Sequence, residues 1–423
     1  MSSLDSIDIY NPDNYVNAVP LADFKRLREH APVHWHTHPD GGGYWVVSRH
    51  EDVMKVSRDH KTFSAERGFV LVDDLPPEIL AQVKGQLLGM DPPNHGPIRR
   101  AVISRFTSKM LAELEPKVRA ITKRLLTEAL AKPDCNFVYD VAGELPTSVI
   151  GSMLGVPQDM WHQLREWSDM QTSASDPDIG GSPEEVNNAS IAMGTYGYQL
   201  AAERKDKGGD DLISLLVNVE VDGHQVSEME FASLFIQITV AGNETTRALI
   251  SGGMYELIQR PELYRELEAS CLAGGESNTA LMKTAIEEML RWTCPLHYFR
   301  RTATCDTEIA GQKIKANDKV VMLYTSANFD EAVYEQPEQF DIHRQVNPHM
   351  AFGHGIHLCL GANLARMEMR VFLEEFFKMF AGVEITGECQ RIRSNLVNGF
   401  KQMPVKLIPA KGCWPELSGL GLL

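Results

Sequence analysis

One cysteine near the C-terminal end, Cys359, is surrounded by glycines and followed directly by a predicted helix. Gly353, Gly355 and Gly361 carry no Cβ, so the backbone can bring N–H groups close to the cysteine sulfur. Apolar residues recur at helical spacing from Gly361 to Phe380, which places Cys359 at a helix N-terminus. Backbone N–H groups and the helix dipole both stabilise a thiolate. The segment therefore predicts a loop and a helix built around an anionic sulfur.

The pattern Phe-Gly-x-Gly-x-His-x-Cys-x-Gly is matched in full between Phe352 and Gly361. A buried structural cysteine in a glycine-rich turn is the simpler alternative. The complete pattern favours a thiolate ligand instead, and haem iron is the acceptor that suits such a ligand. A thiolate on haem iron promotes cleavage of the O–O bond, which is the chemistry of a monooxygenase.

Length and composition are ordinary for a globular protein. The 423 residues would suit about three average domains. Motifs near residues 95, 245, 288 and 359 must all reach one cofactor, however, so we expect a single domain over residues 1–410 and a flexible tail over 411–423. Hydrophobic residues make up 43% of the chain, yet no apolar run is long enough to cross a bilayer.

Charge and cysteine content narrow the partners and the location. A formal net charge of -16 repels phosphate backbones, so nucleic acid is not expected as a partner. The segment Met1 to Asp8 is acidic and lacks the basic start and apolar stretch of a secretory signal. Seven cysteines without regular spacing indicate reduced thiols. We expect a cytoplasmic protein without a membrane anchor.

Helical periodicity dominates the chain, and short strands lie near both ends. The predicted fold class is mainly α with small β-sheets. Helices are predicted over residues 98–131, 184–206, 227–259, 279–292 and 361–380. Strands are predicted over residues 43–47, 308–309, 319–322 and 405–408.

The longest predicted helix carries a polar island in its middle. Ser227 and Glu230 form a capping-box pattern at its start. Within otherwise apolar sequence, Ala241 to Thr246 contains Glu244 next to Thr245, and an acid beside an alcohol is suited to relaying protons. The hydroxyl of a threonine in a helix can also hydrogen-bond to a carbonyl of the preceding turn, which loosens the helix hydrogen bonds and lets water enter. An exposed polar turn on a surface helix is the alternative.

Glu288 and Arg291 lie one helical turn apart, which places both charges on one face. A Phe-Asp-x-x-Arg segment just before the cysteine loop supplies a further arginine, Arg344. The same Glu-x-x-Arg spacing occurs at three other places, where we expect surface ion pairs: Glu244/Arg247, Glu262/Arg265 and Glu388/Arg391.

Together these motifs resemble those of the cytochrome P450 superfamily, in its soluble bacterial form, over nearly the whole chain. The resemblance implies the P450 fold, with haem between the long central helix and the cysteine loop. It implies haem b, iron protoporphyrin IX, as the cofactor. The roles implied are Cys359 as the iron ligand, Glu244 and Thr245 in proton delivery, and Glu288, Arg291 and Arg344 as a buried structural triad.

The two haem propionates need cationic partners in a mostly buried pocket. A His-x-x-x-Arg motif and two further basic residues are the implied partners, and two small residues are implied haem contacts. These residues are His95, Arg99, Arg301 and His357, with Ala241 and Gly361. One position departs from the family, because Phe329 stands where many members have an arginine. The ion pair of that arginine must be absent or replaced.

The resemblance implies a monooxygenase that inserts one atom of O2 into a hydrophobic substrate. Electrons would come from NAD(P)H through a ferredoxin reductase and a ferredoxin, and the protein would be a monomer. A haem-thiolate peroxygenase or isomerase, or a haem protein that only binds ligands, is the alternative. The acid and alcohol pair argues against both. Basic residues beside the propionate motif form either a solvated face or a docking face for an acidic electron donor: Arg99, Arg100, Arg105 and Lys109.

The substrate class is predicted from apolar residues and from the short sequence motif Ala241 to Arg247. Ala-Gly-Asn-Glu-Thr-Thr-Arg resembles hydroxylases of terpenoids, sterol side chains and related lipids. The expected pocket residues are Phe69, Val70, Val72, Leu87, Leu88, Phe235, Ile238, Leu296, Phe299 and Val397. Three alternating histidines, His34, His36 and His38, could chelate a metal, but a solvent-facing strand edge is the expected structure.

Overall fold

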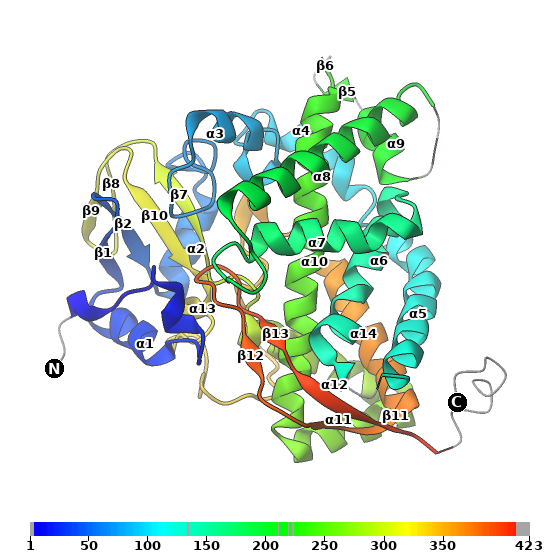
Figure 1. Cartoon of the computed structure of the whole chain (residues 1–423). Coiled ribbons are helices and arrows are strands. Elements are labelled where there is room, and N and C mark those ends of the chain that lie inside the picture. Colours follow the sequence, from blue (N-terminus) through cyan, green and yellow to red (C-terminus); the bar gives the residue numbers. More distant parts are fainter. Residues whose placement is uncertain are drawn as a thin grey trace.

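The computed structural model describes residues 4–411, apart from residues 133–134, 208, 210, 219 and 222–223. The long helix α10 (Glu228–Ile258) runs through the middle of the molecule, with a helical body on one side and the main sheet on the other (Figure 1). The tail expected over 411–423 lies, beyond residue 411, outside the described residues.

The mainly α class predicted from periodicity is confirmed. The predicted helices at 184–206, 227–259, 279–292 and 361–380 correspond to α8, α10, α12 and α14. Besides α10, the helices have these bounds: α1 (Leu21–His30), α2 (His50–Arg58), α3 (Pro77–Val83), α4 (His95–Ile103), α5 (Ser108–Leu130), α6 (Glu144–Leu154), α7 (Trp161–Thr172), α8 (Pro183–Arg204), α9 (Leu212–Val217), α11 (Pro261–Ala273), α12 (Gly275–Thr293), α13 (Tyr324–Ala327) and α14 (Ala362–Met379).

The single helix predicted over residues 98–131 is wrong. The chain forms two helices there, α4 and α5, separated by a turn. Thr107 caps the second helix, because its side-chain oxygen accepts a hydrogen bond from the Met110 N–H at 3.4 Å. Periodicity alone missed this break, since apolar residues continue at helical spacing on both sides of it.

A five-stranded sheet joins the N-terminal part of the chain to the segment after α12. Its order is β1-β2-β10-β7-β3, and only the β2–β10 pair is parallel. These strands are β1 (Val33–Thr37), β2 (Gly43–Val47), β3 (Phe63–Ser64), β7 (Tyr298–Ala303) and β10 (Lys319–Leu323). Smaller pairings involve β4 (Cys135–Asn136), β5 (Glu220–Val221), β6 (His224–Gln225), β8 (Thr307–Ile309), β9 (Gln312–Ile314), β11 (Phe380–Ile385), β12 (Gln390–Arg391), β13 (Phe400–Gln402) and β14 (Pro404–Pro409).

The histidines of β1 and His38, which directly follows the strand, do not form the solvent-facing edge that the sequence suggested. His36 and His38 are buried, and His38 Nε2 lies 3.1 Å from a carboxylate oxygen of Asp73. Burial lowers the pKa of His36 to about 4, so this side chain is neutral at physiological pH. Within the described residues, no group of three or more His, Cys, Asp or Glu side chains is arranged to hold a metal ion.

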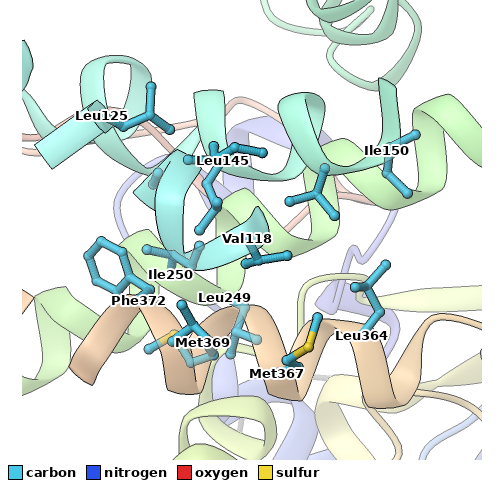
Figure 2. Close-up of a cluster of buried hydrophobic side chains, with 14 of the residues drawn as sticks. Val118, Leu125, Leu145, Ile150, Leu249, Ile250, Leu364, Met367, Met369 and Phe372 are labelled. Atoms are coloured by element: carbon cyan, nitrogen blue, oxygen red, sulfur yellow. The ribbon is translucent and has the colours of Figure 1, made fainter. Parts of the chain in front are cut away.

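The main core lies where α5, α6, α10 and α14 meet (Figure 2). Apolar side chains of these four helices pack together there, so that α14 lies against both α5 and α10. In the described part of the chain, none of the helices has the length and apolar content needed to span a bilayer. The core side chains in Figure 2 include Val118, Leu125, Leu145, Ile150, Leu249, Ile250, Leu364, Met367, Met369 and Phe372.

Candidate functional site

The cysteine loop has the geometry that its glycines predict. Gly353 and Gly355 adopt φ angles of +63° and +72°, which favour glycine, and a Cβ on Gly355 would collide with the carbonyl oxygen of Ser57. The Cys359 N–H donates to the Phe352 carbonyl at 3.0 Å, which closes the loop. Helix α14 begins just beyond, at Ala362. The predicted position of the sulfur at a helix N-terminus is therefore confirmed.

The Cys359 thiol faces a cavity between this loop and α10. The Cys359 side chain is accessible and opens onto this cavity. Burial raises the pKa of the Cys359 thiol, while the Gly361 N–H and the positive charges of Arg99 and Arg366 act in the opposite direction. These donors stabilise a thiolate once a cation such as iron neutralises its charge. The described cysteines are free thiols, as expected.

The four predicted propionate partners all line the same cavity. Arg301 is buried on β7, donates to the Arg300 carbonyl at 2.8 Å, and forms no salt bridge with a described residue. The imidazoles of His95 and His357 lie 4.7 Å apart, and Nε2 of each is buried without a hydrogen-bond partner. Burial lowers the pKa of His95 to about 4 and that of His357 to about 2.

A buried arginine without an acid and two unpartnered imidazoles are costly unless an anionic group completes them. The residues present therefore fit a haem, whose propionates would supply that charge. Arg99 differs from the other three, because its guanidinium donates to the carbonyl of Leu358, next to Cys359. The implied haem contacts Ala241 and Gly361 also line the cavity.

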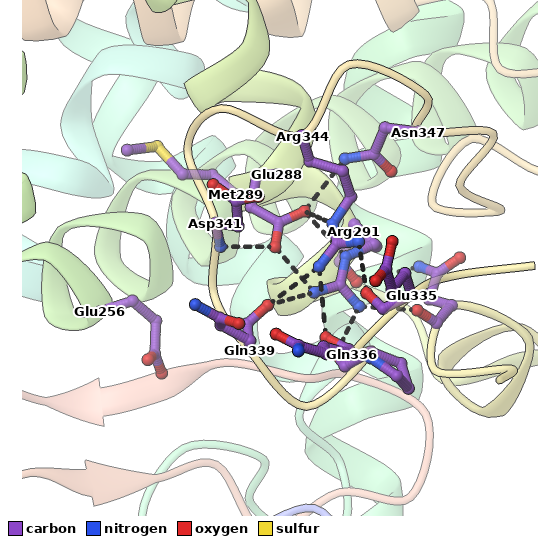
Figure 3. Close-up of polar contacts among 12 residues, drawn as sticks. Glu256, Glu288, Met289, Arg291, Glu335, Gln336, Gln339, Asp341, Arg344 and Asn347 are labelled. Atoms are coloured by element: carbon purple, nitrogen blue, oxygen red, sulfur yellow. Dashed lines mark hydrogen bonds and ion pairs between the residues drawn. The ribbon is translucent and has the colours of Figure 1, made fainter.

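The structure brings Glu288, Arg291 and Arg344 together behind the loop (Figure 3). Two Arg291 nitrogens donate to the Glu288 carboxylate at 2.7 and 2.8 Å, and Arg344 Nε donates to it at 3.1 Å. The Asp341 N–H and the Asn347 side-chain amide also donate hydrogen bonds to the Glu288 carboxylate, at 2.9 and 3.1 Å. Glu288 and Arg291 have no exposed side-chain surface. Their hydrogen-bonding capacity is nearly filled, as a buried ion pair requires.

Phe329 replaces the missing arginine pair with a different contact. The Arg291 guanidinium lies 5.0 Å from the centre of the Phe329 ring and 5.5 Å from that of Trp292. A cation over an aromatic face is stabilised without a second charge. The departure from the family pattern is thus accommodated by the triad itself.

A second ion pair behind the loop was not predicted. Glu287 of α12 binds Arg366 of α14 at 2.6 and 2.8 Å, and His349 Nε2 lies 3.1 Å from the same carboxylate. Although burial opposes the shift, Arg366 and His349 lower the pKa of Glu287 to about 2. The Arg366 guanidinium also lies 4.6 Å from the Phe352 ring. Glu287 therefore ties α12 to both ends of the cysteine loop.

The polar island of α10 divides between two environments. Thr245 lines the cavity, and its hydroxyl donates to the Ala241 carbonyl at 2.7 Å, as predicted. Glu244 is not among the cavity-lining residues; its side chain is buried in an ion pair with Arg247, which also binds Asp169 of α7 at 2.8 Å. The surface ion pair expected for Glu244 and Arg247 is wrong, because α6 and α7 cover this face of α10.

Two carboxylates share one buried guanidinium in this cluster. Burial raises the pKa of Glu244, and the negative charge of Asp169 adds to the rise, while Arg247 opposes it. One oxygen of Glu244, Oε1, has no hydrogen-bond partner. The pKa of the acid is therefore raised, and Oε1 is the oxygen left open to exchange a proton.

Half of the predicted pocket residues line the cavity: Leu87, Leu88, Ile238, Leu296 and Phe299. The rest lie elsewhere in this structure. Phe235 packs between Phe231, Tyr196 and Gly197, because α8 covers that part of α10. Val72 belongs to the N-terminal core, Phe69 packs on Gly89, and Val70 accepts a backbone hydrogen bond from Arg300. Val397 forms an isolated antiparallel β-bridge with Leu296 and does not itself line the cavity.

Several cavity-lining residues were missed, because nothing in a single sequence marks which apolar side chains meet. They include Val102, Phe106, Ile150, Gln237, Leu249, Leu290, Leu364 and Glu368. Gly242 also lines the cavity, and a Cβ there would lie 2.7 Å from the Ile150 side chain, so this glycine admits α6. The wall as a whole is mostly apolar, with basic groups near the cysteine.

Comparison with known proteins agrees with this geometry. The family model for cytochrome P450 matches residues 198–406. A steroid C26-monooxygenase from Rhodococcus jostii is 37% identical over 424 residues, covering 97% of this chain and 87% of that protein. A methyl-branched lipid omega-hydroxylase from Mycobacterium bovis is 38% identical over 412 residues, covering 95% of this chain and 94% of that protein.

A solved structure of a Mycobacterium marinum cytochrome P450 in complex with pseudoionone has a TM-score of 0.88 and 34% sequence identity. The superposition covers 96% of this chain and 99% of the Mycobacterium marinum chain. The chain belongs to the cytochrome P450 family. It is a monooxygenase that depends on haem iron, takes a hydrophobic substrate and receives electrons from redox partners.

Proposed function

We propose that this P450 hydroxylates a terpenoid, a sterol side chain or a related lipid. The observation that carries the proposal is the mostly apolar cavity that ends at Cys359 and is bounded by α10. A substrate with few polar groups loses little hydration on entering such a wall, and burial of its surface provides the binding energy. The relatives named for steroid and branched-lipid oxidation support this class.

The cofactor is proposed to be haem b, with Cys359 as its iron ligand. Haem bound in this way supplies the activation of O2. The chain contributes the thiolate, which α14 and the Gly361 N–H stabilise. It also contributes Arg301, His95 and His357 as partners of the propionates, and Arg99 beside the cysteine loop.

Proton delivery is proposed for Glu244 and Thr245. The Thr245 hydroxyl lies at the cavity wall, where it can hold water beside the reacting oxygen. Glu244 lies on the far side of α10, so a proton passes from its free Oε1 only after the side chain turns or water enters the helix groove. Arg247, which bonds to both Glu244 and Asp169, would hold the Glu244 side chain in place between turnovers.

Electrons are proposed to come from NAD(P)H through a ferredoxin reductase and a ferredoxin. Arg99 contacts the cysteine loop; exposed Arg100 follows it on α4, and half-buried Arg105 and exposed Lys109 come next in the sequence. On a chain with a net charge of -16 this basic group suits an acidic partner. The monomeric state, the cytoplasmic location and the single-domain organisation of residues 1–410 stay predictions.

A haem-thiolate peroxygenase or isomerase, and a haem protein that only binds ligands, are the competing proposals. Neither needs a hydroxyl and an acid for proton delivery to O2. A variant that separates oxygen use from product formation distinguishes them.

A panel of terpenoids, sterols with intact side chains and branched fatty acids should shift the Soret band from low to high spin. The shift is expected because an apolar compound that fills the mostly apolar cavity would exclude water from the haem site. Small aromatics and macrolides serve as controls and should shift the band less. A larger shift with the controls would overturn the substrate class while leaving the monooxygenase assignment in place.

Thr245→Ala should uncouple the enzyme. Because general acid and base groups contribute about 10² to 10⁴-fold, product formation is expected to fall by about 10² or more, while NAD(P)H consumption falls much less and hydrogen peroxide accumulates. Product, peroxide and NAD(P)H should be measured together with a substrate from the spin-shift panel.

Thr239→Ala is the matched control for that variant. Thr239 lies on the same helix and is buried, but it is not among the cavity-lining residues. Its removal should leave coupling unchanged. Equal coupling in wild type and Thr245→Ala would show that the polar island is helix architecture and not a proton relay.

A further inference from the structure

A second cavity lies apart from the one that reaches Cys359, and the two share none of their described lining residues. Strand β13 lies beside α10, and it forms part of the wall together with β12, α12, α13 and the start of α1 (Figure 1). The volume of about 290 Å³ is near the lower end of the range for small-molecule sites, about 300 to 1,000 Å³. The proposed reaction uses none of these residues, so the cavity has room for a separate ligand.

Arg391 of β12 lies on the wall of this second cavity. The surface ion pair expected for Glu388 and Arg391 is wrong, because pairing of β12 with β13 brings the Arg391 guanidinium to 5.2 Å from the centre of the Phe400 ring. Its Nε donates to the Tyr15 carbonyl at 3.2 Å, and its Nη2 donates to the side-chain oxygen of Asn398. Within the described residues, Nη1 has no hydrogen-bond acceptor and the guanidinium forms no ion pair. Half-buried Arg391 therefore presents unused N–H donors to the cavity.

The other charges around the cavity leave this guanidinium without a counterion. Glu256 of α10 is the other charged residue among the described lining residues, and it forms its ion pair with Arg260, four residues further along the chain. Burial lowers the pKa of Arg391 to about 10, while Glu256 and Tyr255 act in the opposite direction. The side chain is therefore cationic at neutral pH. A cation held in this way is stabilised when an anion enters the cavity and accepts its hydrogen bonds.

Aromatic side chains supply much of the remaining wall. The rings of Tyr255 and Phe400 have centres 4.8 Å apart, and those of Trp292 and Phe329 have centres 5.3 Å apart. A phosphate ion would use the guanidinium but leave this aromatic surface uncovered. A carboxylate pairs with a guanidinium through two parallel hydrogen bonds, and an apolar body attached to it would cover the rings. We propose that this cavity binds a small organic monocarboxylate, whose charged end pairs with Arg391 and whose apolar body packs on the aromatic side chains.

The monocarboxylate site lies next to the triad behind the cysteine loop. Trp292 and Phe329 line the cavity, and the centres of their rings lie 5.5 and 5.0 Å from the Arg291 guanidinium. The ligand would therefore pack on the two rings that cover a buried cation of the triad. Because it would bind the folded chain and not the unfolded one, the melting temperature should rise with the ligand concentration. The melting temperature is thus a readout that does not involve turnover.

The first test measures binding to the holoenzyme by titration calorimetry, with benzoate, phenylacetate and hexanoate as probes. Clotrimazole, whose imidazole ligates haem iron, is bound beforehand so that the haem cavity is filled. At least one acid should bind at one site per chain. Its neutral amide should bind at least about 10-fold more weakly, because a hydrogen bond to a charged group contributes more than one to a neutral group. No binding by any acid, equal binding of acid and amide, or equally tight binding of inorganic phosphate would overturn the proposal.

The second test removes the cation. Arg391→Gln should weaken binding of the acid by about 10 to 10²-fold, and Arg391→Lys, which keeps the charge but not the planar fork, should weaken it less. Arg393→Gln is the matched control, because Arg393 lies two residues later, binds Asp13 and is not among the described residues that line the cavity. It should bind the acid as wild type does. Unchanged binding in Arg391→Gln would show that the acid is held elsewhere and overturn the proposal.

Cys389 locates the bound acid without any substitution. It is a half-buried free cysteine on the cavity wall, whereas Cys305 is an exposed free cysteine outside it. At about ten times its dissociation constant, the acid should slow alkylation of Cys389 about 10-fold by mass action and leave alkylation of Cys305 unchanged. An unchanged rate at Cys389 would overturn the proposal, even if Arg391→Gln fails to fold. Failure of the proposed substrate class would leave these outcomes as they are, because none of them involves turnover.

Discussion

Cys359→His is expected to abolish the absorption band that marks cysteine-ligated haem in the reduced carbon monoxide complex. The band depends on electron donation from a thiolate to iron. Cys359 lies on the cavity wall beside the propionate partners, at the start of α14, and a histidine there cannot supply a thiolate. Monooxygenase activity should be lost with the band, because thiolate donation favours O–O cleavage. The reduced carbon monoxide spectrum and product formation are the measurements.

Cys305→Ser is the control, because Cys305 is an exposed free cysteine outside the cavity. It should keep both the band and the activity. Retention of the band in Cys359→His, together with its loss in a variant of another cysteine, would assign the ligand to that other residue. The haem-to-protein ratio shows whether Cys359→His still binds haem. If it does not, the reduced carbon monoxide spectrum of Cys359→Ser should be measured instead, and it should lack the band.

Glu288→Ala is expected to give haem-free or insoluble protein. The substitution leaves Arg291 fully buried without its carboxylate and removes the acceptor of the Asp341 N–H and the Asn347 amide. Breaking a buried ion pair costs on the order of 3 to 5 kcal/mol. A typical domain is stable by only about 5 to 15 kcal/mol, so this loss is a large part of the total. Haem content, solubility and melting temperature are the measurements.

Glu262→Ala is the matched control. Glu262 also begins a Glu-x-x-Arg pattern, but its side chain is exposed on the first turn of α11. Exposed ion pairs contribute about 0 to 1 kcal/mol, so this variant should behave as wild type. Equal haem content and equal melting temperatures in the two variants would remove the distinction between the buried triad and a surface pair.

The sequence by itself determined the features that local chemistry specifies. The loop around Cys359 could be predicted because its glycines and the helix after it lie within about thirty residues of each other. The long central helix was predictable from its capping box, and its ends agree with α10 within one residue. The mainly α class followed from periodicity, and the family followed from motifs at fixed spacing.

Contacts between distant segments were decided only by the tertiary structure. Glu287, Arg366 and His349 show no pattern in the sequence, yet they hold the cysteine loop from behind. Glu244 and Arg247 have the spacing of a surface pair, and only the covering helices make the pair a buried one. Phe235 and Val72 are as apolar as Ile238, but Phe235 packs against α8 and Val72 packs in the N-terminal core.

The physical reason is that hydrophobic spacing specifies which face of an element is buried and not what buries it. The partner depends on how helices from different parts of the chain pack, which a local pattern does not contain. Glu368 shows this most clearly. Its sequence neighbours mark it as one more charged residue of a helix, and only the packing of α14 beside the cavity leaves it buried, without a cation and near a protonated state.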